Sequence, residues 1–493
     1  MTKRRKAREL SRRAALGAAV GGVGELFGCA RTGLELDGGS GATSGAPPDG
    51  SVGGTGNTGG KPVAPIFEPE RVPEDGGTFD LGVQAGEMTA DSVLFWTHVA
   101  SGEGVELCVW PESSGARPER LHVFAVEPSP GGFAHERATG LSPGTRYRYA
   151  FFDRRRTRRS RIGRVRTAPS GERGEPLRIG SLACTNFAYL PYRTAELLAL
   201  EPLDVFIHAG DMSYNDGAQT LEEYREKWRS TLGSAGYRAL LASTGAYFTW
   251  DDHEVTNDFD AEDLALSSPE YFAVARAAFF ESLPKRPNES GGLWQSFRWG
   301  STAELFVLDC RGERRPSTLN GERPIFVSDA QLDWLREGLA ASRSHFKIIV
   351  TSVPIGRLSE ELWASPFERW EGYAAQREEL LAFIDAMGIE NVWFLSGDLH
   401  MGLVHRVDRS GRDARHWEIC SGPGGQSSHD LPLFQPGAEE RHARAFPPEQ
   451  VAYASHELAY TTFEFDPAAD SVRVRFVNVE GQTAFDRVLS HQA

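Results

Sequence analysis

The chain has 493 residues, of which 40% are hydrophobic and 10% are aromatic, so it can supply packed cores for two folded domains. This composition excludes an intrinsically disordered chain. The 53 basic residues against 68 acidic residues give a net charge of -15, which argues against specific nucleic-acid binding through a basic surface.

Residues 1–30 read as an export signal. A basic start containing Arg12-Arg13 leads into a short, mildly apolar run that carries several glycines and Glu25. This pattern is typical of the twin-arginine route, and the run is too short and too polar for a membrane-spanning helix. Leu26-Phe27-Gly28-Cys29 resembles a bacterial lipobox, so we expect either a lipid on Cys29 or cleavage or retention without one.

These features predict the twin-arginine export machinery as a partner. The expected location is the periplasm or the cell surface, with membrane anchoring through a lipidated Cys29 or with release as a secreted protein. Residues 31–76 are rich in Gly, Ser and Pro and should form a flexible tether. The spacing of the five cysteines matches neither a zinc ribbon nor a disulfide framework.

Residues 77–169 have the texture of an all-β domain. Gly, Pro and Ser turns separate the expected strands, which cover residues 92–99, 105–110, 120–126 and 146–152. We expect a small fibronectin-like sandwich. Eight arginines lie between Arg154 and Arg166, and they form either a solvated hairpin or a patch that gathers anionic substrates or lipid headgroups.

Residues 175–493 form the second expected domain, in which apolar strands alternate with helical segments. Strands are predicted at 177–183, 204–210, 246–250, 303–309, 346–352 and 392–397, helices at 328–342 and 372–387, and a hairpin at 458–478. This alternation predicts an α/β core whose helices cover the sheet faces.

Chemically active side chains follow four of these strands. They are Cys184 and Asn186; Asp211 and Tyr214; Asp251, Asp252, His253, Glu254 and Asn257; and Asp398 and His400, with His405 slightly later. Each one alone fits a turn or a buried core position. Because ligands of open α/β sheets bind outside the carboxyl ends of the strands, their shared position predicts a site.

Several motifs carry a family resemblance from about Phe79 to the C-terminus. They are "FDLGVQAGEMTADSVLFWTHV", Gly210-Asp211-x-x-Tyr214, "WDDHE" at 250–254, "AQLDWLREGL" and "SGDLH" at 396–400. In this order they resemble the PhoD-type alkaline phosphatase/phosphodiesterase family, a branch of the calcineurin-like metallophosphoesterases. The resemblance implies an α/β metallophosphoesterase-type sandwich core preceded by a small all-β fibronectin-like sandwich.

The resemblance also implies the metal ligands. It assigns one ion to Cys184, Asp211, Tyr214 and His400, a donor set that suits Fe3+ or Zn2+. Asp211 would bridge to a second position that takes Asp398 and either Asp252 or Asn257. No histidine stands on the strand near Thr351 where related enzymes have one, so this all-oxygen position favours Ca2+, one ion or two.

The implied activity is hydrolysis of phosphate monoesters or diesters by a hydroxide that the two metals activate, in an exported phosphatase that scavenges phosphate. His253 would protonate the leaving group or stabilise phosphoryl charge, with Asp251 or Glu254 orienting it. Asn186 and Arg311 are candidate substrate-binding residues, although Arg311 could instead meet a buried carboxylate.

Two other functions remain open. One is a phospholipase D-like phosphodiesterase that acts on lipids or cell-wall polymers with the same two-metal site. The other is a non-catalytic surface-binding lipoprotein on a retired phosphatase scaffold. The full set of candidate ligands argues against the second, because a retired site should have lost some of them.

Overall fold

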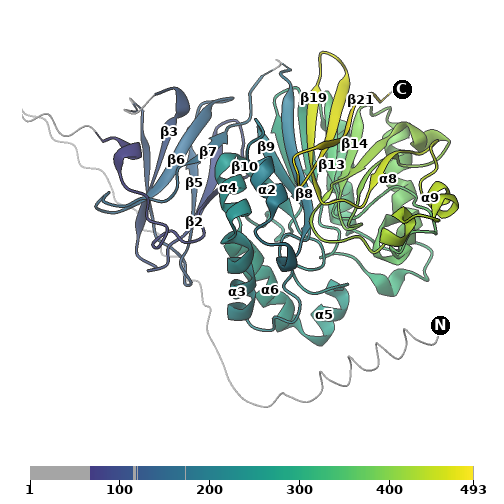
Figure 1. The fold of residues 1–493 in the computed structure, drawn as a ribbon, viewed down its shortest axis with the longest axis horizontal. Helices are drawn as coiled ribbons and strands as arrows, with labels where there is room; N and C mark the ends of the chain where they lie inside the picture. The colour runs from purple at the N-terminus through teal and green to yellow at the C-terminus, as the bar shows by residue number, and fades with distance from the viewer. Residues whose placement is uncertain (1–66, 115–117, 119, 172–173, 492–493) are drawn as a thin grey trace, which may run out of the picture. The chain divides into compact units, whose positions relative to one another are not determined.

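The computed structural model describes residues 67–114, 118, 120–171 and 174–491 (Figure 1). The described residues belong to one compact unit. The predicted export signal, Cys29 and most of the predicted tether lie outside the described residues. Within the described part of the chain, no helix is long and apolar enough to cross a membrane.

The N-terminal part of the described chain is a β-sandwich. One sheet has four strands in the order β4 (His122–Val126), β3 (Val105–Pro111), β6 (Arg146–Asp153) and β7 (Gly163–Arg166). The facing layer consists of β1 (Val83–Gly86), β2 (Ser92–His98) and β5 (Phe133–Thr139). Phe95 of β2 packs on Tyr149 of β6 with ring centroids 4.6 Å apart, so the two layers share a core.

The facing layer continues into the main sheet of the protein. β1 pairs in parallel with β10 (Gly245–Thr249) at Gly86 and Ala246, which places β1, β2 and β5 at one end of a ten-stranded sheet. A Cβ at Gly86 would lie 2.3 Å from the carbonyl oxygen of Pro284, so only glycine permits this close approach. The sandwich and the α/β core are therefore joined by backbone hydrogen bonds.

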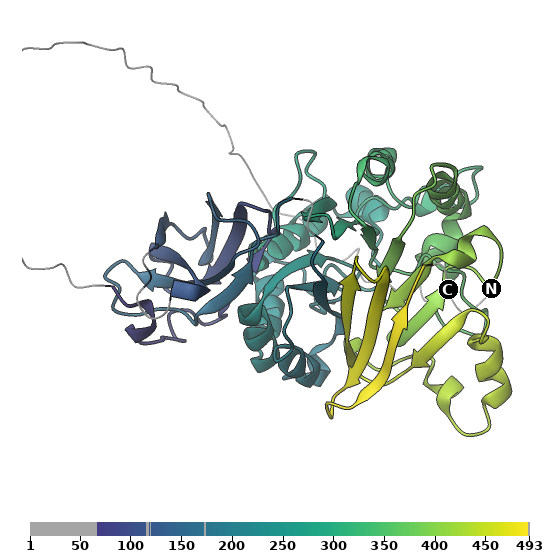
Figure 2. The same ribbon diagram turned by 90° about the horizontal axis from the view of Figure 1, so that it is seen from above.

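Two large sheets face each other in the α/β part (Figures 1 and 2). The ten-stranded sheet runs β21 (Thr483–Leu489), β20 (Ser471–Asn478), β19 (Ala459–Asp466), β8 (Leu177–Thr185), β9 (Val205–Ala209), β10, β1, β2, β5, with β17 (Pro423–Gly425) also on β8. The seven-stranded sheet runs β11 (Gln295–Trp299), β12 (Ala303–Val307), β13 (Phe346–Val350), β14 (Val392–Ser396), β16 (Trp417–Cys420), β15 (Gly402–Arg406), β18 (Val451–Ser455).

Alternation along the strands explains the layers. In β9, Val205 and Ile207 join the core between the sheets, whereas Phe206 packs among the helices. The helices in the cluster with Phe206 are α2 (Arg193–Leu198), α3 (Leu221–Leu232), α4 (Ala235–Ser243), α5 (Ala261–Ser267) and α6 (Pro269–Ser282). α7 (Asp329–Ala341) and α8 (Ala374–Ala386) cover the other sheet. α9 (Glu439–Ala445) joins a smaller apolar cluster with Leu403 of β15.

Short 3₁₀ helices complete the described chain, at Pro69–Arg71, Glu112–Ser114, Phe187–Tyr189, Pro316–Thr318, Pro366–Glu368, Trp370–Tyr373, Arg412–Arg415 and Leu431–Phe434. The predicted fold class, an α/β sandwich preceded by an all-β sandwich, is confirmed. The predicted strands, the two predicted helices and the C-terminal hairpin are all present, each within a few residues of its expected place.

The predicted tether extends too far toward the C-terminus. Phe67 packs edge-on against Phe152 of β6, with ring centroids 5.3 Å apart, and Asp75 donates its backbone N–H to the carbonyl of Arg159 at 2.8 Å. These contacts attach residues 67–76 to the sandwich. The folded part therefore begins before residue 77.

The arginine-rich segment is a turn whose charges are largely paired within the protein. The pairs are Arg154 with Glu127, Arg156 with Glu106, Arg158 with Asp75, Arg159 with Glu74, Arg164 with Glu112, and Arg166 with Glu175 and Asp204. Because carboxylates already offset these charges, the structure favours the solvated hairpin over an anion-gathering patch.

Candidate metal centre

The candidate site lies where strands of the two sheets end. Cys184 stands at the end of β8, Asp211 follows β9, and Asp398 and His400 follow β14. All four have positive φ, at 55°, 59°, 67° and 53° in that order. Non-glycine residues seldom adopt this left-handed backbone, and such strained positions cluster at functional sites.

Gly397 lets the strand ends approach one another. A Cβ at this position would lie 2.9 Å from the Ala183 side chain and 2.9 Å from the carbonyl oxygen of Ala209. The ends of β8, β9 and β14 therefore meet closely only because Gly397 has no side chain. This close approach brings together the residues that stand at or just after the ends of these three strands.

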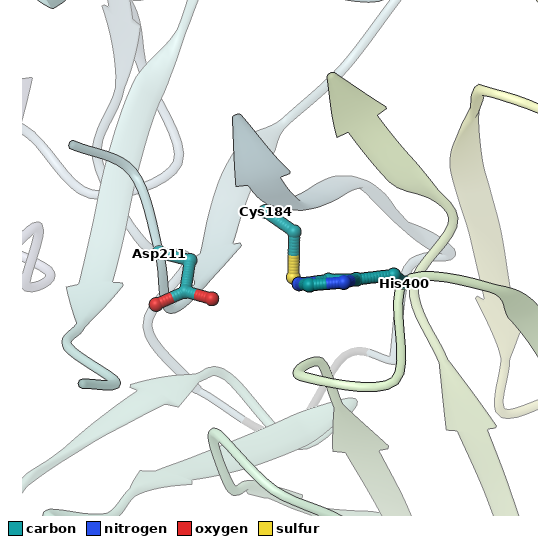
Figure 3. Close-up of side chains that lie close together, drawn as sticks. All are labelled: Cys184, Asp211 and His400. Atoms are coloured by element: carbon teal, nitrogen blue, oxygen red, sulfur yellow. The ribbon is translucent and has the colours of Figure 1, made fainter. Parts of the chain in front are cut away.

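Cys184, Asp211 and His400 form the first group of possible ligands. Their sulfur, oxygen and nitrogen atoms lie within 4.8 Å of one another, and all three residues are buried. Figure 3 shows the Cys184 sulfur beside the His400 ring, with the Asp211 carboxylate facing both. The Tyr214 hydroxyl lies 3.4 Å from Asp211 Oδ2 and 3.4 Å from His400 Nε2, so the phenol belongs to the same group.

Asp211, Asp252 and His253 form a second group, again with ligand atoms within 4.8 Å. Asp211 belongs to both groups, which is the position that a bridging carboxylate needs. The His253 backbone N–H donates to Asp211 Oδ1 at 3.2 Å, and its ring stacks on Tyr214 with centroids 4.0 Å apart. The two groups are therefore adjacent and fixed relative to each other.

Burial and charge explain the electrostatics of the first group. Burial, with the neighbouring carboxylates acting in the same direction, raises the pKa of the Cys184 thiol and the Tyr214 phenol well above their usual range. Burial also raises the pKa of Asp211, although His253 opposes it. Burial lowers the pKa of His400 to about 3, so its imidazole is neutral.

These residues fit a bound metal ion. A buried thiolate, phenolate and carboxylate can all be ionised together only where a cation offsets their charge. His400 Nδ1 is buried and lacks a hydrogen-bond partner among the described residues. A neutral imidazole beside sulfur and oxygen donors is a donor set for a transition metal.

For the second position, the structure favours Asp252 over Asn257. Asp252 is 5% exposed and, although burial acts to raise its pKa, the charges of Arg311 and His253 lower it, so it is a carboxylate. Asn257 is exposed, and its backbone N–H binds Asp216. Asp398, the other carboxylate predicted for this position, is also close to Arg311: its Oδ1 lies 3.4 Å from Arg311 Nη2.

The partner of His253 is a residue that the sequence did not single out. His253 Nδ1 lies 2.7 Å from Asp216 Oδ2. Asp251 instead binds Arg311, and Glu254 accepts the backbone N–H groups of residues 211, 212 and 251, so the expectation that one of them orients His253 is wrong. Burial acts to lower the pKa of His253, but Asp211 and Asp216 raise it to about 10.

Arg311 is buried beside the candidate site and has almost no exposed surface with which to contact a substrate. It is 1% exposed, and its guanidinium binds both oxygens of Asp251 at 2.8 Å and one oxygen of Glu368 at 3.0 Å. Of the two alternatives for Arg311, the structure favours the buried carboxylate over the substrate.

Asn186 is half-buried, and its side chain accepts the Ala188 N–H at 3.0 Å, so it shapes the turn after β8. Its role in substrate binding stays a prediction. His405 is fully buried and lies 3.1 Å from Glu418, in the interior of the protein. Cys108, Cys184, Cys310 and Cys420 are all free thiols.

Comparison with known proteins decides the family. Residues 179–474 match the family model for the PhoD-like phosphatase, and residues 68–169 match the model for its N-terminal domain. The chain belongs to the PhoD-like phosphatase family. The resemblance seen in the strand-end motifs is thereby confirmed.

Relatives of this PhoD-like chain agree with the assignment. Over 378 residues it is 27% identical to Alkaline phosphatase D of Bacillus subtilis (strain 168), and the match covers 65% of this chain and 64% of the relative. A solved structure of PhoD has a TM-score of 0.70 at 22% identity, covering 87% of this chain and 90% of the other. The purple acid phosphatase PPD1 from yellow lupin (Lupinus luteus) seeds has a TM-score of 0.58 at 14% identity, covering 83% and 73%. The chain therefore shares its fold with both of these phosphatase structures.

Proposed function

We propose that this PhoD-like protein is a metal-dependent phosphoric ester hydrolase of the alkaline phosphatase type, acting on phosphate monoesters or diesters. The observation that carries the proposal is the position of Asp211, a buried carboxylate shared by two adjacent groups of metal-binding side chains. The name of the Bacillus relative supports the same activity.

The donor chemistry suggests which ions these residues hold. Cys184, Asp211, Tyr214 and His400 would hold Fe3+ or Zn2+, and Asp211, Asp252 and Asp398 would hold Ca2+, one ion or two. Two adjacent cations neutralise an anionic ester and lower the pKa of a water molecule toward neutrality.

His253 is the residue proposed to act on the leaving group. Its Nδ1–H donates to Asp216, which leaves Nε2–H as the donor available to the departing ester oxygen or to a phosphoryl oxygen. The stack with Tyr214 holds the plane of the ring. Asp216 acts as a positioning residue through His253.

Replacing Asp216 with Asn should leave the metal content unchanged and lower kcat by about 10- to 100-fold, because the imidazole loses the carboxylate that orients it. Metal analysis and steady-state kinetics on one preparation separate the two effects. Glu226→Gln, on the exposed side of α3, is the control that should change neither quantity. An unchanged kcat in the Asp216→Asn variant would show that Asp216 does not position His253 for catalysis.

Replacing Tyr214 with Phe tests the phenolate ligand. If the first position holds Fe3+, phenolate binding gives the protein a visible charge-transfer band, and the Tyr214→Phe protein should lose it. The absorption spectrum of the concentrated protein is the measurement. A band that survives the substitution would take Tyr214 off the ligand set.

The preferred ester is decided by the ratio of kcat/KM for p-nitrophenyl phosphate to that for bis(p-nitrophenyl) phosphate. Hydrolysis of either ester supports the proposed function, and failure to hydrolyse both would overturn it. The arginine hairpin gives no support to a lipid-directed diesterase, since its charges are paired. The candidate ligands, all present and close together, argue against a retired scaffold.

Export by the twin-arginine route is part of the proposal. It rests on the basic start, Arg12-Arg13 and the lipobox-like sequence before Cys29. The mature protein would then act in the periplasm or at the cell surface, anchored through a lipid on Cys29 or secreted. Mass spectrometry of the N-terminal peptide of the mature protein would distinguish lipidation from plain cleavage.

A further inference from the structure

Trp363 is a large aromatic residue exposed near the candidate centre. It lies in the segment between β13 and α8, and 68% of its surface is exposed. Single exposed apolar residues are common on proteins and by themselves indicate nothing. The surroundings of Trp363 are what distinguish it.

A series of rings connects Trp363 to the metal-binding group. The Trp363 ring stacks near the exposed His429, with centroids 6.0 Å apart and planes 29° apart. The His429 ring in turn lies 5.4 Å from the ring of His400, with planes 38° apart. Trp363 therefore lies two ring contacts from a candidate metal ligand.

Buried polar side chains hold the backbone around Trp363. Its N–H donates to Asp430 Oδ1 at 2.8 Å, and Asp430 is 6% exposed. The next carbonyl, that of Ala364, accepts from Arg369 Nη1 at 2.7 Å, and Arg369 is 3% exposed. Glu368, in the same segment, forms an ion pair with the buried Arg311. An exposed ring on a fixed backbone loses little conformational freedom when a ligand binds to it.

We propose that Trp363, backed by His429, is a stacking platform for a planar ring carried by the phosphate ester, an aryl group or a nucleobase. This inference rests on the proposed function, because the phosphate must lie at the metal centre for its ester arm to reach the platform. Indole presents a broad π-face, and stacking of a base on such a ring tolerates any base.

The neighbours of Trp363 favour a ring over a lipid surface. Glu360 and Glu361 precede it closely in the chain, and Glu361 is paired with Arg441 and Arg444. Two acidic residues against two arginines leave this surface without the excess of basic charge that binds an anionic membrane. Binding of a neutral planar ring needs no such charge.

The test compares adenosine 5'-monophosphate with ribose 5-phosphate, which share the sugar and the phosphate but differ in the base. Stacking on one aromatic side chain corresponds to about 5- to 150-fold in affinity. The metal-loaded wild type should therefore show a kcat/KM at least about fivefold higher for the nucleotide. Trp363→Leu should abolish this preference while leaving kcat/KM for ribose 5-phosphate unchanged, and Trp363→Phe should retain part of it.

Phe367→Leu is the matched control. Phe367 is 58% exposed in the same segment, and its ring contacts no other aromatic ring of the described residues, so its removal should leave the preference intact. Equal preference in wild type and Trp363→Leu would overturn the platform without affecting the proposed function. If Trp363→Leu instead slows only the hydrolysis of phosphatidylglycerol vesicles, the residue contacts lipid and the proposal is wrong. A wild type that hydrolyses neither these esters nor the two p-nitrophenyl esters would overturn the proposed function itself.

Discussion

The Asp211→Asn protein is expected to lose at least about 1,000-fold in kcat/KM on p-nitrophenyl phosphate and to be purified with less metal. Asp211 lies in both groups of ligand atoms, so one substitution removes a negative donor from each. Asparagine has nearly the same size, and the change should leave the packing around position 211 intact. Kinetics and metal analysis are made on the same sample.

Cys108→Ser is the control for Asp211→Asn. Cys108 is fully buried in the β-sandwich, where it packs with Trp110, Ala150 and Phe152, so its loss affects only the sandwich core. Neither metal content nor kcat/KM should change in this variant. Near-wild-type turnover in Asp211→Asn would show that the site assignment is wrong.

The second large effect concerns stability. Arg311→Met should lower the free energy of unfolding by about 3–5 kcal/mol, because it leaves the buried carboxylate of Asp251 without its partner. The two residues are 1% and 0% exposed, and the guanidinium binds both carboxylate oxygens at 2.8 Å. Methionine keeps most of the aliphatic stem, so loss of the charge dominates. The midpoint of urea unfolding is the measurement.

Arg323→Met provides the comparison. Arg323 pairs with Asp329 and Glu379 at the surface, where such pairs contribute about 0–1 kcal/mol. Its unfolding midpoint should therefore stay close to that of the wild type. An Arg311→Met protein as stable as Arg323→Met would mean that the buried ion pair between Arg311 and Asp251 does not stabilise the fold.

The site residues at the strand ends were predictable because the signals that reveal them lie within short stretches of sequence. Each apolar run is followed by residues that bind metals, and the carboxyl ends of parallel strands meet at one edge of a sheet. Cys184, Asp211 and His400 therefore gather from three segments that lie far apart in the sequence. The α/β core and the strands of the sandwich followed from alternation and turn residues in the same way.

Other features depend on long-range geometry that one sequence does not encode in a readable pattern. Asp216 lies five positions after Asp211 in the same loop, but only folding shows that it, rather than Asp251, meets His253. Similarly, the β1–β10 pairing depends on close approach at Gly86, which is an unremarkable glycine in the sequence. Trp363 gave no periodic signal, because loop conformations do not follow from hydrophobic spacing.

We propose that this protein holds a working pair of metal positions around Asp211. The most direct test is the metal content of the purified full-length protein by plasma mass spectrometry, combined with its phosphatase activity before and after chelation. We expect about one Fe or Zn per chain together with Ca, loss of activity on chelation, and recovery only when both kinds of ion return. Undiminished hydrolysis by a chain free of metal would contradict it.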